Sequence, residues 1–393
     1  MNIQKEKTDE RETKMTELEL IEQIPDLKSR AFVRTLYESR PKDLPENPKK
    51  NTWYVYRPEG CICSEGTPYY STMKIGSANN LMILFCGGGV ALDAYSAARP
   101  SKIAPEAGQT TFYTPSCAVM GYFYGRGGIA ASDRKDNPFK DWSVVIVQYA
   151  SGDFHCGTND FAYEDEELGS GVCHHHGYLN YRAMVEKIKE FVPAPDRILV
   201  TGFSAGGFGT ALLTDDVMRI FPECKDVTAL VDSATFSYDG WHEVAEKQWK
   251  APKEICDRLV SDDLVLDSLL ALTRQQGDRV RIAFTCTYRD ALLSLCQNYA
   301  DGKGMIFDQE GGDHFQAVLK HLVETLQEEV PGVSIYLFDK PHEEVEVGNL
   351  TEHTIIASPW ALDYSFDGRK FIDWLQDVVC GRPSLVGLDL LNR

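Results

Sequence analysis

The sequence has 393 residues, of which 43% are hydrophobic and 25% are charged, proportions that are ordinary for a soluble globular protein. Its 59 acidic and 40 basic residues give a formal net charge of -19, which disfavours nucleic acid and anionic membrane surfaces as partners. No stretch approaches about 18 consecutive apolar residues, so we expect no membrane-spanning helix.

The N-terminal region differs in composition from the rest of the chain. Residues 1–16 form a mixed-charge tail that we expect to be mobile. Helical spacing of apolar residues follows over 17–37, and residues 38–52 are rich in Pro and Lys, as is typical of a loop. We therefore expect an N-terminal tail, helix and Pro-rich linker over residues 1–50, and one larger α/β domain over 51–393.

The N-terminus and the cysteines indicate a compartment. The first 20 residues lack the apolar segment of a secretory signal. The 11 cysteines are an odd number and show no zinc or redox spacing. Reduced thiols without a signal are typical of a cytoplasmic protein, and this is the location that we expect.

Short, continuous apolar runs predict strands that are buried on both faces. They occupy residues 81–85, 143–150, 197–202, 226–233, 279–287 and 333–339. Helical patterns lie between several of them, at 180–192, 209–221 and 314–330. This alternation predicts a mostly parallel sheet with helices on both faces, in which ligands bind at the carboxyl edge of the strands.

The stretch TGFSAGGFG at residues 201–209 places a serine between glycines at the end of a predicted strand. Gly202, Ser204 and Gly206 fit the G-x-S-x-G pattern, in which a sharp strand-to-helix turn exposes a nucleophilic serine. The first turn of the following helix has free N–H groups, so the backbone N–H of Ala205 is a candidate oxyanion donor. The alternative interpretation is a structural turn that happens to contain serine.

A second oxyanion donor is expected from another loop that follows a strand. The glycines of LFCGGGV, residues 84–90, would let the backbone approach a reacting oxygen closely. These glycines lack the G-x-G-x-x-G spacing of a dinucleotide site and the G-K-S/T of a phosphate loop. We therefore expect no organic cofactor.

An activated serine needs a histidine base, which follows the serine in the chain order typical of this elbow. Of the histidines after Ser204, three lie in suitable places: His314, His342 and His353. His353 alone lies at some distance beyond the last predicted strand, in a loop that can fold back over the carboxyl edge. His314 begins a predicted helix and stays an alternative.

The same arrangement needs an acid that orients the histidine. Asp290 directly follows the predicted strand at 279–287, where a loop at the carboxyl edge begins. Asp301 and Asp313 are the alternatives. Asp153 also follows a predicted strand, and we expect it to brace loops through backbone N–H groups rather than to act in catalysis.

Three consecutive histidines, His174, His175 and His176, raise the question of a metal site. Adjacent side chains on a strand or loop point in different directions, so three in a row are not expected to bind one ion. No matching spacing of Cys, His or Asp lies nearby. We therefore predict no metal site here.

Seven segments of the sequence, in this order, resemble the pectin acetylesterase/Notum family of α/β-hydrolase-like carboxylesterases. The resemblance extends from residue 50 to residue 360, and the segments are 85–97, 147–157, 174–183, 201–209, 229–236, 286–292 and 351–354. It implies that Ser204 is the nucleophile, Asp290 the orienting acid and His353 the base. It also implies oxyanion donors, which are Gly88, Gly89 and Ala205.

The resemblance implies a serine carboxylesterase of α/β-hydrolase-like fold that needs no metal or cofactor. The expected substrates are short acyl esters, acetyl above all, on a small molecule, a sugar or an oligosaccharide. Two alternatives remain open: a lipid or protein deacylase with a longer acyl pocket, and an inactive hydrolase fold that acts as a binding module. The sequence does not determine the oligomeric state.

Overall fold

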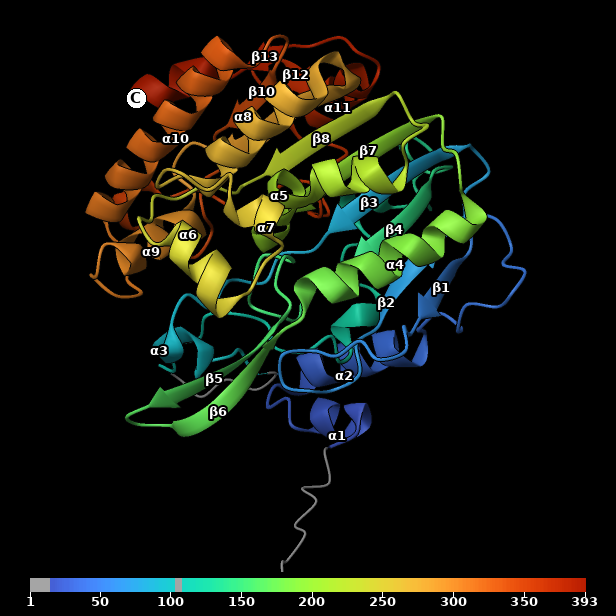
Figure 1. Ribbon diagram of the computed structural model, residues 1–393, viewed down its shortest axis with the longest axis vertical. Coiled ribbons are helices and arrows are strands. Elements are labelled where there is room, and N and C mark those ends of the chain that lie inside the picture. The colour runs from blue at the N-terminus through green and yellow to red at the C-terminus, as the bar shows by residue number, and fades with distance from the viewer. Residues whose placement is uncertain (1–14, 103–107) are drawn as a thin grey trace, which may run out of the picture.

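The computed structural model describes residues 15–102 and 108–393, so most of the predicted mobile tail lies outside the described residues. Its centre is a nine-stranded sheet in the order β1-β2-β4-β3-β7-β8-β9-β10-β13 (Figure 1). The strands from β4 to β13 in this order pair in parallel, and β1, β2 and β4 pair antiparallel. The expected mostly parallel α/β fold is confirmed.

All six predicted strands are present in the central sheet. They are β3 (Asn80–Phe85), β4 (Ser143–Val147), β7 (Arg197–Phe203), β8 (Val227–Asp232), β9 (Val280–Thr287) and β10 (Ser334–Phe338). Their residues are almost completely buried, as continuous apolar runs require when helices cover both faces of a sheet. The edge strands were not predicted; they are β1 (Trp53–Tyr56), β2 (Ser71–Lys74) and β13 (Leu385–Val386).

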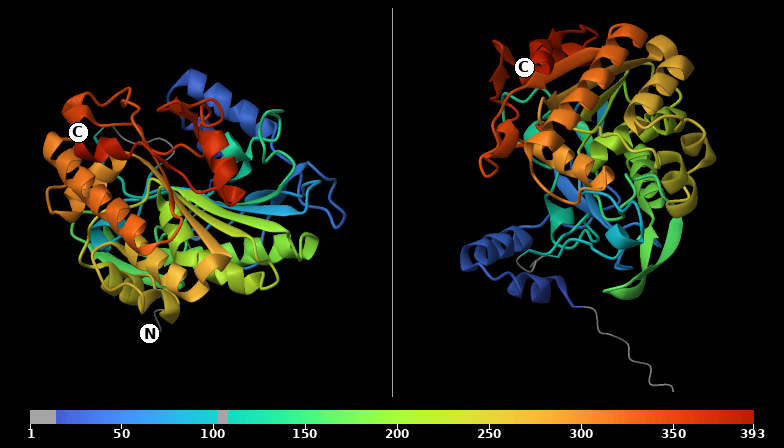
Figure 2. Two further views of the ribbon diagram at one scale, coloured as in Figure 1. Left: turned by 90° about the horizontal axis from the view of Figure 1, so that it is seen from above. Right: turned by 90° about the vertical axis from the view of Figure 1, so that its left-hand side faces the viewer.

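Helices cover the two faces of this sheet. The longer ones are α4 (Gly177–Phe191), α5 (Ala205–Ile220), α8 (Leu264–Gln276), α9 (Ala291–Ala300), α10 (Gln309–Glu329) and α11 (Phe371–Val379). Helices α4, α5 and α8 lie on one face of the sheet and α11 lies on the other (Figure 2). Every residue of α5 except Arg219 is buried, so this helix forms the centre of its layer.

The N-terminal region contains two helices, α1 (Glu17–Glu22) and α2 (Leu27–Glu38), where the spacing predicted one. The break falls at Pro25, which has no N–H to donate and disfavours helical geometry in the residue before it. Asp26 then caps α2 by accepting the N–H of Ser29 at 2.7 Å. Glu17 accepts a hydrogen bond from Tyr122 at 2.7 Å, so α1 packs on the larger domain, and a boundary at residue 50 stays a prediction.

Smaller elements extend from the sheet. Strands β5 (Asn159–Asp165) and β6 (Gly169–His175) form a separate hairpin. The remaining short elements are α3 (Ala94–Ala97), α6 (Trp241–Glu243), α7 (Lys253–Cys256), β11 (Ser365–Phe366) and β12 (Arg369–Lys370). Among the described residues, no helix has both the length and the apolar character that crossing a bilayer requires.

Candidate active site

Ser204 lies at the sharp turn between β7 and α5, with backbone angles φ 54° and ψ -129°. Residues other than glycine rarely adopt positive φ, and such strained conformations cluster at functional sites. The flanking glycines are required by packing. A Cβ atom on Gly202 would lie 2.1 Å from the carbonyl oxygen of Gly206, and one on Gly206 would lie 2.0 Å from that of Phe85. The pattern of the elbow therefore follows from backbone contacts.

The glycine loop after β3 lies directly beside Ser204. A Cβ on Gly87 would be 2.7 Å from the Cβ of Ser204, so no larger residue fits there. Within the described residues, the backbone N–H groups of Gly88 and Gly89 donate no hydrogen bond. Ala205 is the first residue of α5, where a helical N–H has no acceptor within the helix. Three unused donors thus lie at or next to the elbow.

Contacts with neighbouring segments hold the glycine loop in place. The carbonyl oxygen of Gly88 accepts the N–H of Thr114 at 2.8 Å. Gly89 has φ 78°, and a Cβ there would lie 1.9 Å from the carbonyl oxygen of Phe112, so only glycine fits. The buried His155 ring donates its Nε2–H to the carbonyl oxygen of Cys86 at 2.9 Å. Burial lowers the pKa of His155 to about 4, so this ring stays neutral and holds the loop as a donor.

His353 pairs with Asp290 at the same edge of the sheet. Its Nδ1 lies 2.7 Å from Oδ2 and 2.9 Å from Oδ1 of Asp290. The Asp290 side chain is fully buried and caps α9 by accepting the N–H of Leu293 at 3.0 Å. The other ring nitrogen, Nε2 of His353, is buried and has no hydrogen-bond partner among the described residues. This nitrogen is available to accept a proton.

Asp232, the last residue of β8, connects this histidine loop to the elbow. Its backbone carbonyl accepts the N–H of Ser204 at 2.9 Å. Its carboxylate oxygen Oδ2 accepts the N–H groups of Ile355 and Ile356, both at 2.8 Å. Asp232 therefore bonds both the nucleophile candidate and the segment just after His353. Sequence analysis missed this role, although a carboxylate that ends an apolar strand was a visible signal.

The electrostatics of the pair favour a basic histidine. Burial lowers the pKa of His353, but the charge and hydrogen bond of Asp290, with the charge of Asp232, outweigh this effect and raise it above the ordinary value. Burial also raises the pKa of Asp232, to about 6, against the effect of its backbone hydrogen bonds. The structure contains no hydrogen bond between Ser204 and His353 Nε2. Such contacts are often long in enzymes without substrate.

A match to a known protein family shows which family this chain belongs to. The sequence matches the family described as pectinacetylesterase over residues 46–251, which is more than half of the chain. The chain belongs to the pectinacetylesterase family. It is therefore a carboxylic ester hydrolase, and the expected family resemblance is confirmed.

A solved structure agrees with this family membership at the level of the fold. The crystal structure of the Wnt deacylase Notum from Drosophila superposes with a TM-score of 0.56. The match covers 83% of this chain and 93% of the Notum chain, at 14% sequence identity. At this identity the similarity shows the α/β-hydrolase-like fold alone.

The other histidine and acid candidates of this pectinacetylesterase family member are placed differently. His314 pairs with Asp301 at 2.8 Å, but 42% of its side chain is exposed. Asp313 forms an ion pair with Arg289 at 2.7 Å. His342 Nδ1 accepts two backbone N–H groups of its own turn. Among these candidates, the only histidine with a fully buried carboxylate partner is His353.

Asp153 has the bracing role that the sequence predicted. Its two carboxylate oxygens accept the backbone N–H groups of His155, Gly157 and Gly177 at 3.0, 3.1 and 2.8 Å. The hydroxyl group of Ser151 adds a further hydrogen bond at 2.6 Å. Asp153 thus ties the loop after β4 to the start of α4.

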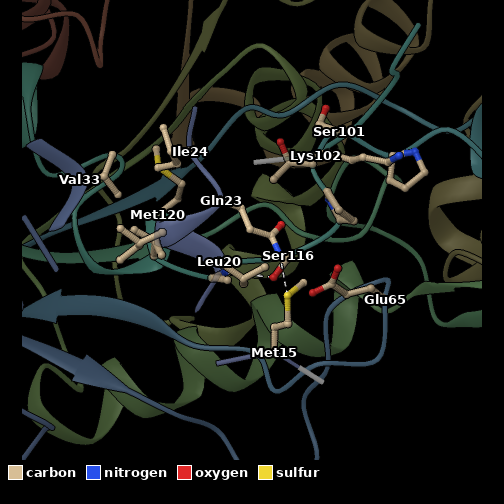
Figure 3. Close-up of a pocket in the computed structure, with 16 residues that line it drawn as sticks. Met15, Leu20, Gln23, Ile24, Val33, Glu65, Ser101, Lys102, Ser116 and Met120 are labelled. Atoms are coloured by element: carbon tan, nitrogen blue, oxygen red, sulfur yellow. Dashed lines mark hydrogen bonds between the residues drawn. The ribbon is translucent and has the colours of Figure 1, made fainter. Parts of the chain in front are cut away.

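An apolar cavity of about 550 Å³ lies between the N-terminal helices and the segment around residues 114–120 (Figure 3). Leu20, Ile24, Val33 and Met120 line it, while Ser204 and His353 do not. Thr114 also lines it, and Thr114 bonds the carbonyl of Gly88 in the glycine loop. The cavity therefore reaches the segment that supports the unused N–H groups.

Proposed function

We propose that this family member is a serine carboxylesterase in which Ser204 is the nucleophile, His353 the general base and Asp290 the acid that orients it. The observation that carries the proposal is the buried His353–Asp290 pair, whose Nε2 has no partner, on a loop that Asp232 ties to Ser204. His353 Nε2 takes the proton from Ser204, and Ser204 Oγ attacks the ester carbonyl. Asp290 keeps the proton of the neutral His353 ring on Nδ1, and it stabilises the imidazolium that forms when Nε2 accepts the proton.

The N–H groups of Gly88, Gly89 and Ala205 are the proposed oxyanion donors. They stabilise the negative charge that develops on the carbonyl oxygen, and each such donor commonly contributes about 3 kcal/mol. His353 then gives its proton to the leaving alcohol, which leaves an acyl group on Ser204. Water attacks the acyl-enzyme with His353 again as base, and the acid product leaves with Ser204 restored.

The proposed substrates are short acyl esters, acetyl above all, on a small molecule, sugar or oligosaccharide. The description of the family as pectinacetylesterase supports an acetyl ester of a carbohydrate. A cytoplasmic location stays a proposal, supported by the eleven cysteines, all of which are free thiols in the structure.

Intact mass after treatment with a fluorophosphonate tests the nucleophile. We expect one adduct on the wild-type protein and none on Ser204→Ala. Ser233→Ala is the matched control, because Ser233 directly follows β8 and also has positive φ, at 51°, but lacks the glycine elbow. It should keep the adduct. A wild-type protein that forms no adduct would contradict the proposal and favour a binding module.

A second candidate function is a lipid or protein deacylase with a longer acyl pocket. The apolar cavity favours it, because Thr114 connects the cavity to the proposed oxyanion loop. The name of Notum, a Wnt deacylase, supports the same chemistry on a related fold. In this case α1 and α2 would cover the bound acyl chain.

A series of nitrophenyl esters from acetyl to octanoyl distinguishes the two candidates. If the cavity holds an acyl chain, Ala118→Trp, which fills it, lowers kcat/KM for octanoyl at least about tenfold and leaves acetyl unchanged. Leu27→Trp is the control, because Leu27 is 73% exposed on α2. A preference for acetyl that Ala118→Trp does not alter would support the short-acyl candidate.

A further inference from the structure

Side chains at the base of the β5–β6 hairpin form a cluster that the proposed hydrolysis does not use. His174 Nδ1 lies 2.6 Å from Oδ1 of Asp160, and His176 Nε2 lies 2.8 Å from the same oxygen. Among the described residues, this is the one group of His, Cys, Asp or Glu side chains in which three ligand atoms lie within 4.8 Å of one another. We propose that Asp160, His174 and His176 bind a divalent transition-metal ion of the Zn²⁺ type.

Strand geometry brings the three side chains together. Asp160 on β5 pairs directly with His174 on β6 in the antiparallel register. His176 directly follows β6 as the residue before α4, and its Nε2 reaches the same carboxylate oxygen of Asp160 at 2.8 Å. His175 points to the opposite face, where it is fully buried and its Nδ1–H donates to the carbonyl oxygen of Ser151 at 2.8 Å. Two of the three histidines therefore converge while the middle one does not.

The prediction of no metal site rested on the different directions of three consecutive side chains. The side chain of His175 does point away from the other two, but the side chains of His174 and His176 both reach Asp160. The third ligand, Asp160, comes from the neighbouring strand, 14 residues before His174, and no local spacing predicts it.

The donor set suits zinc and related ions. Two imidazole nitrogens and one carboxylate oxygen are ligands of catalytic and surface Zn²⁺ sites, which keep a fourth position for water. Both imidazoles contact one carboxylate oxygen, and a metal ion would replace the two shared protons. The side-chain exposures of 25% for His174, 16% for His176 and 61% for Asp160 leave the group accessible to an ion from solvent.

The backbone around the cluster is already held in place. The N–H of His174 donates to Ser64 at 3.0 Å, and the N–H of His176 donates to the carbonyl of His174 at 3.0 Å. His176 also precedes the first residue of α4, and its carbonyl accepts the N–H of Asn180 at 3.0 Å. A bound ion would therefore fasten the base of the hairpin to the start of α4, with little backbone ordering needed on binding.

Equilibrium dialysis with Zn²⁺ and metal analysis tests the site on the full chain. The measurement uses Cys380→Ser as the parent, because Cys380 is an exposed thiol that can itself bind zinc. We expect one Zn²⁺ per chain. Adding His174→Gln, His176→Gln or Asp160→Asn should each lower the affinity at least about tenfold. Adding His321→Gln, an exposed histidine of α10, is the matched control and should change nothing.

Two further measurements separate binding from folding. Co²⁺ in place of Zn²⁺ should give ligand-field absorption bands in the parent that are lost in the three ligand variants. Zn²⁺ should also raise the Tm of the parent and not that of Asp160→Asn, an exposed substitution that is expected to leave the metal-free Tm unchanged. No stoichiometric Zn²⁺ in the parent, or an affinity in the three ligand variants that equals that of the parent, would overturn the proposal. Either result leaves the Ser204 hydrolysis unaffected.

Discussion

Two histidine–aspartate pairs in this protein have nearly the same hydrogen bond and very different surroundings. His353 Nδ1 lies 2.7 Å from Asp290, and His314 Nδ1 lies 2.8 Å from Asp301. The side chains of the first pair are 13% and 0% exposed, and those of the second are 42% and 22% exposed. A short hydrogen bond alone therefore does not distinguish a catalytic pair.

Burial and position distinguish the two pairs. Charges interact more strongly in the interior than near water, so Asp290 can raise the basicity of its partner despite the opposing effect of burial. Asp232 ties the segment after His353 to the elbow, whereas His314 lies near the start of α10 with an exposed side chain. The comparison teaches that the tertiary neighbours of a pair, rather than its bond length, decide what it can do.

Replacing each histidine is the strongest test of this difference. We expect His353→Ala to lower kcat for ester hydrolysis by about 10⁴-fold or more, because the base for Ser204 is lost. His314→Ala should leave kcat within the error of the measurement, since His314 pairs with Asp301 and 42% of its side chain is exposed. Steady-state kinetics at fixed pH measures both, and the opposite result would make His314 the base.

Replacing each aspartate tests the orientation and the pH dependence. We expect Asp290→Asn to lower kcat by about 10⁴-fold, as loss of the tautomer-setting acid does in serine hydrolases of this type. His353 must be neutral to accept a proton, and its pKa is raised above 6.5, so kcat/KM of the wild-type protein should fall as the pH is lowered through a value above 6.5.

The same pH profile supplies the control. In Asp290→Asn the residual activity should lose its acid limb at a lower pH, because the negative charge that raises the pKa of His353 is gone. Asp301→Asn should leave the limb where it is in the wild-type protein. A limb that moves with Asp301 and not with Asp290 would contradict the assignment.

Substitutions of Asp232 are expected to lower kcat by a smaller factor than those of His353 or Asp290. We expect Asp232→Ala to lower kcat by about 10²-fold with little change in KM, because the loop that carries His353 loses two hydrogen bonds and shifts relative to the elbow. Asp232→Asn keeps an oxygen that can accept these N–H groups and should restore most of the rate. Equal losses in both variants would mean that the buried charge matters more than loop position.

Local sequence patterns predicted the central sheet well. Six strands and the helices between them appeared as expected, because a strand buried on both faces must be apolar along its whole length. Short edge strands such as β1 carry only four residues, too few for a pattern to be distinguished from loop. The prediction of a single helix over 17–37 was wrong. The apolar spacing continues across Pro25, but this proline divides the segment into two helices.

By itself, the sequence determined the glycine elbow around Ser204, because the pattern of the turn is local: a Cβ on Gly202 would lie 2.1 Å from the carbonyl oxygen of Gly206, only four residues on. Only the tertiary structure decided which histidine pairs with which acid, since His353 and Asp290 lie 63 residues apart in the chain. The same is true of His174 and Asp160, which lie 14 residues apart and meet because the hairpin register pairs them. Steric rules act over a few residues, whereas the pairing of ionisable side chains depends on how distant segments pack.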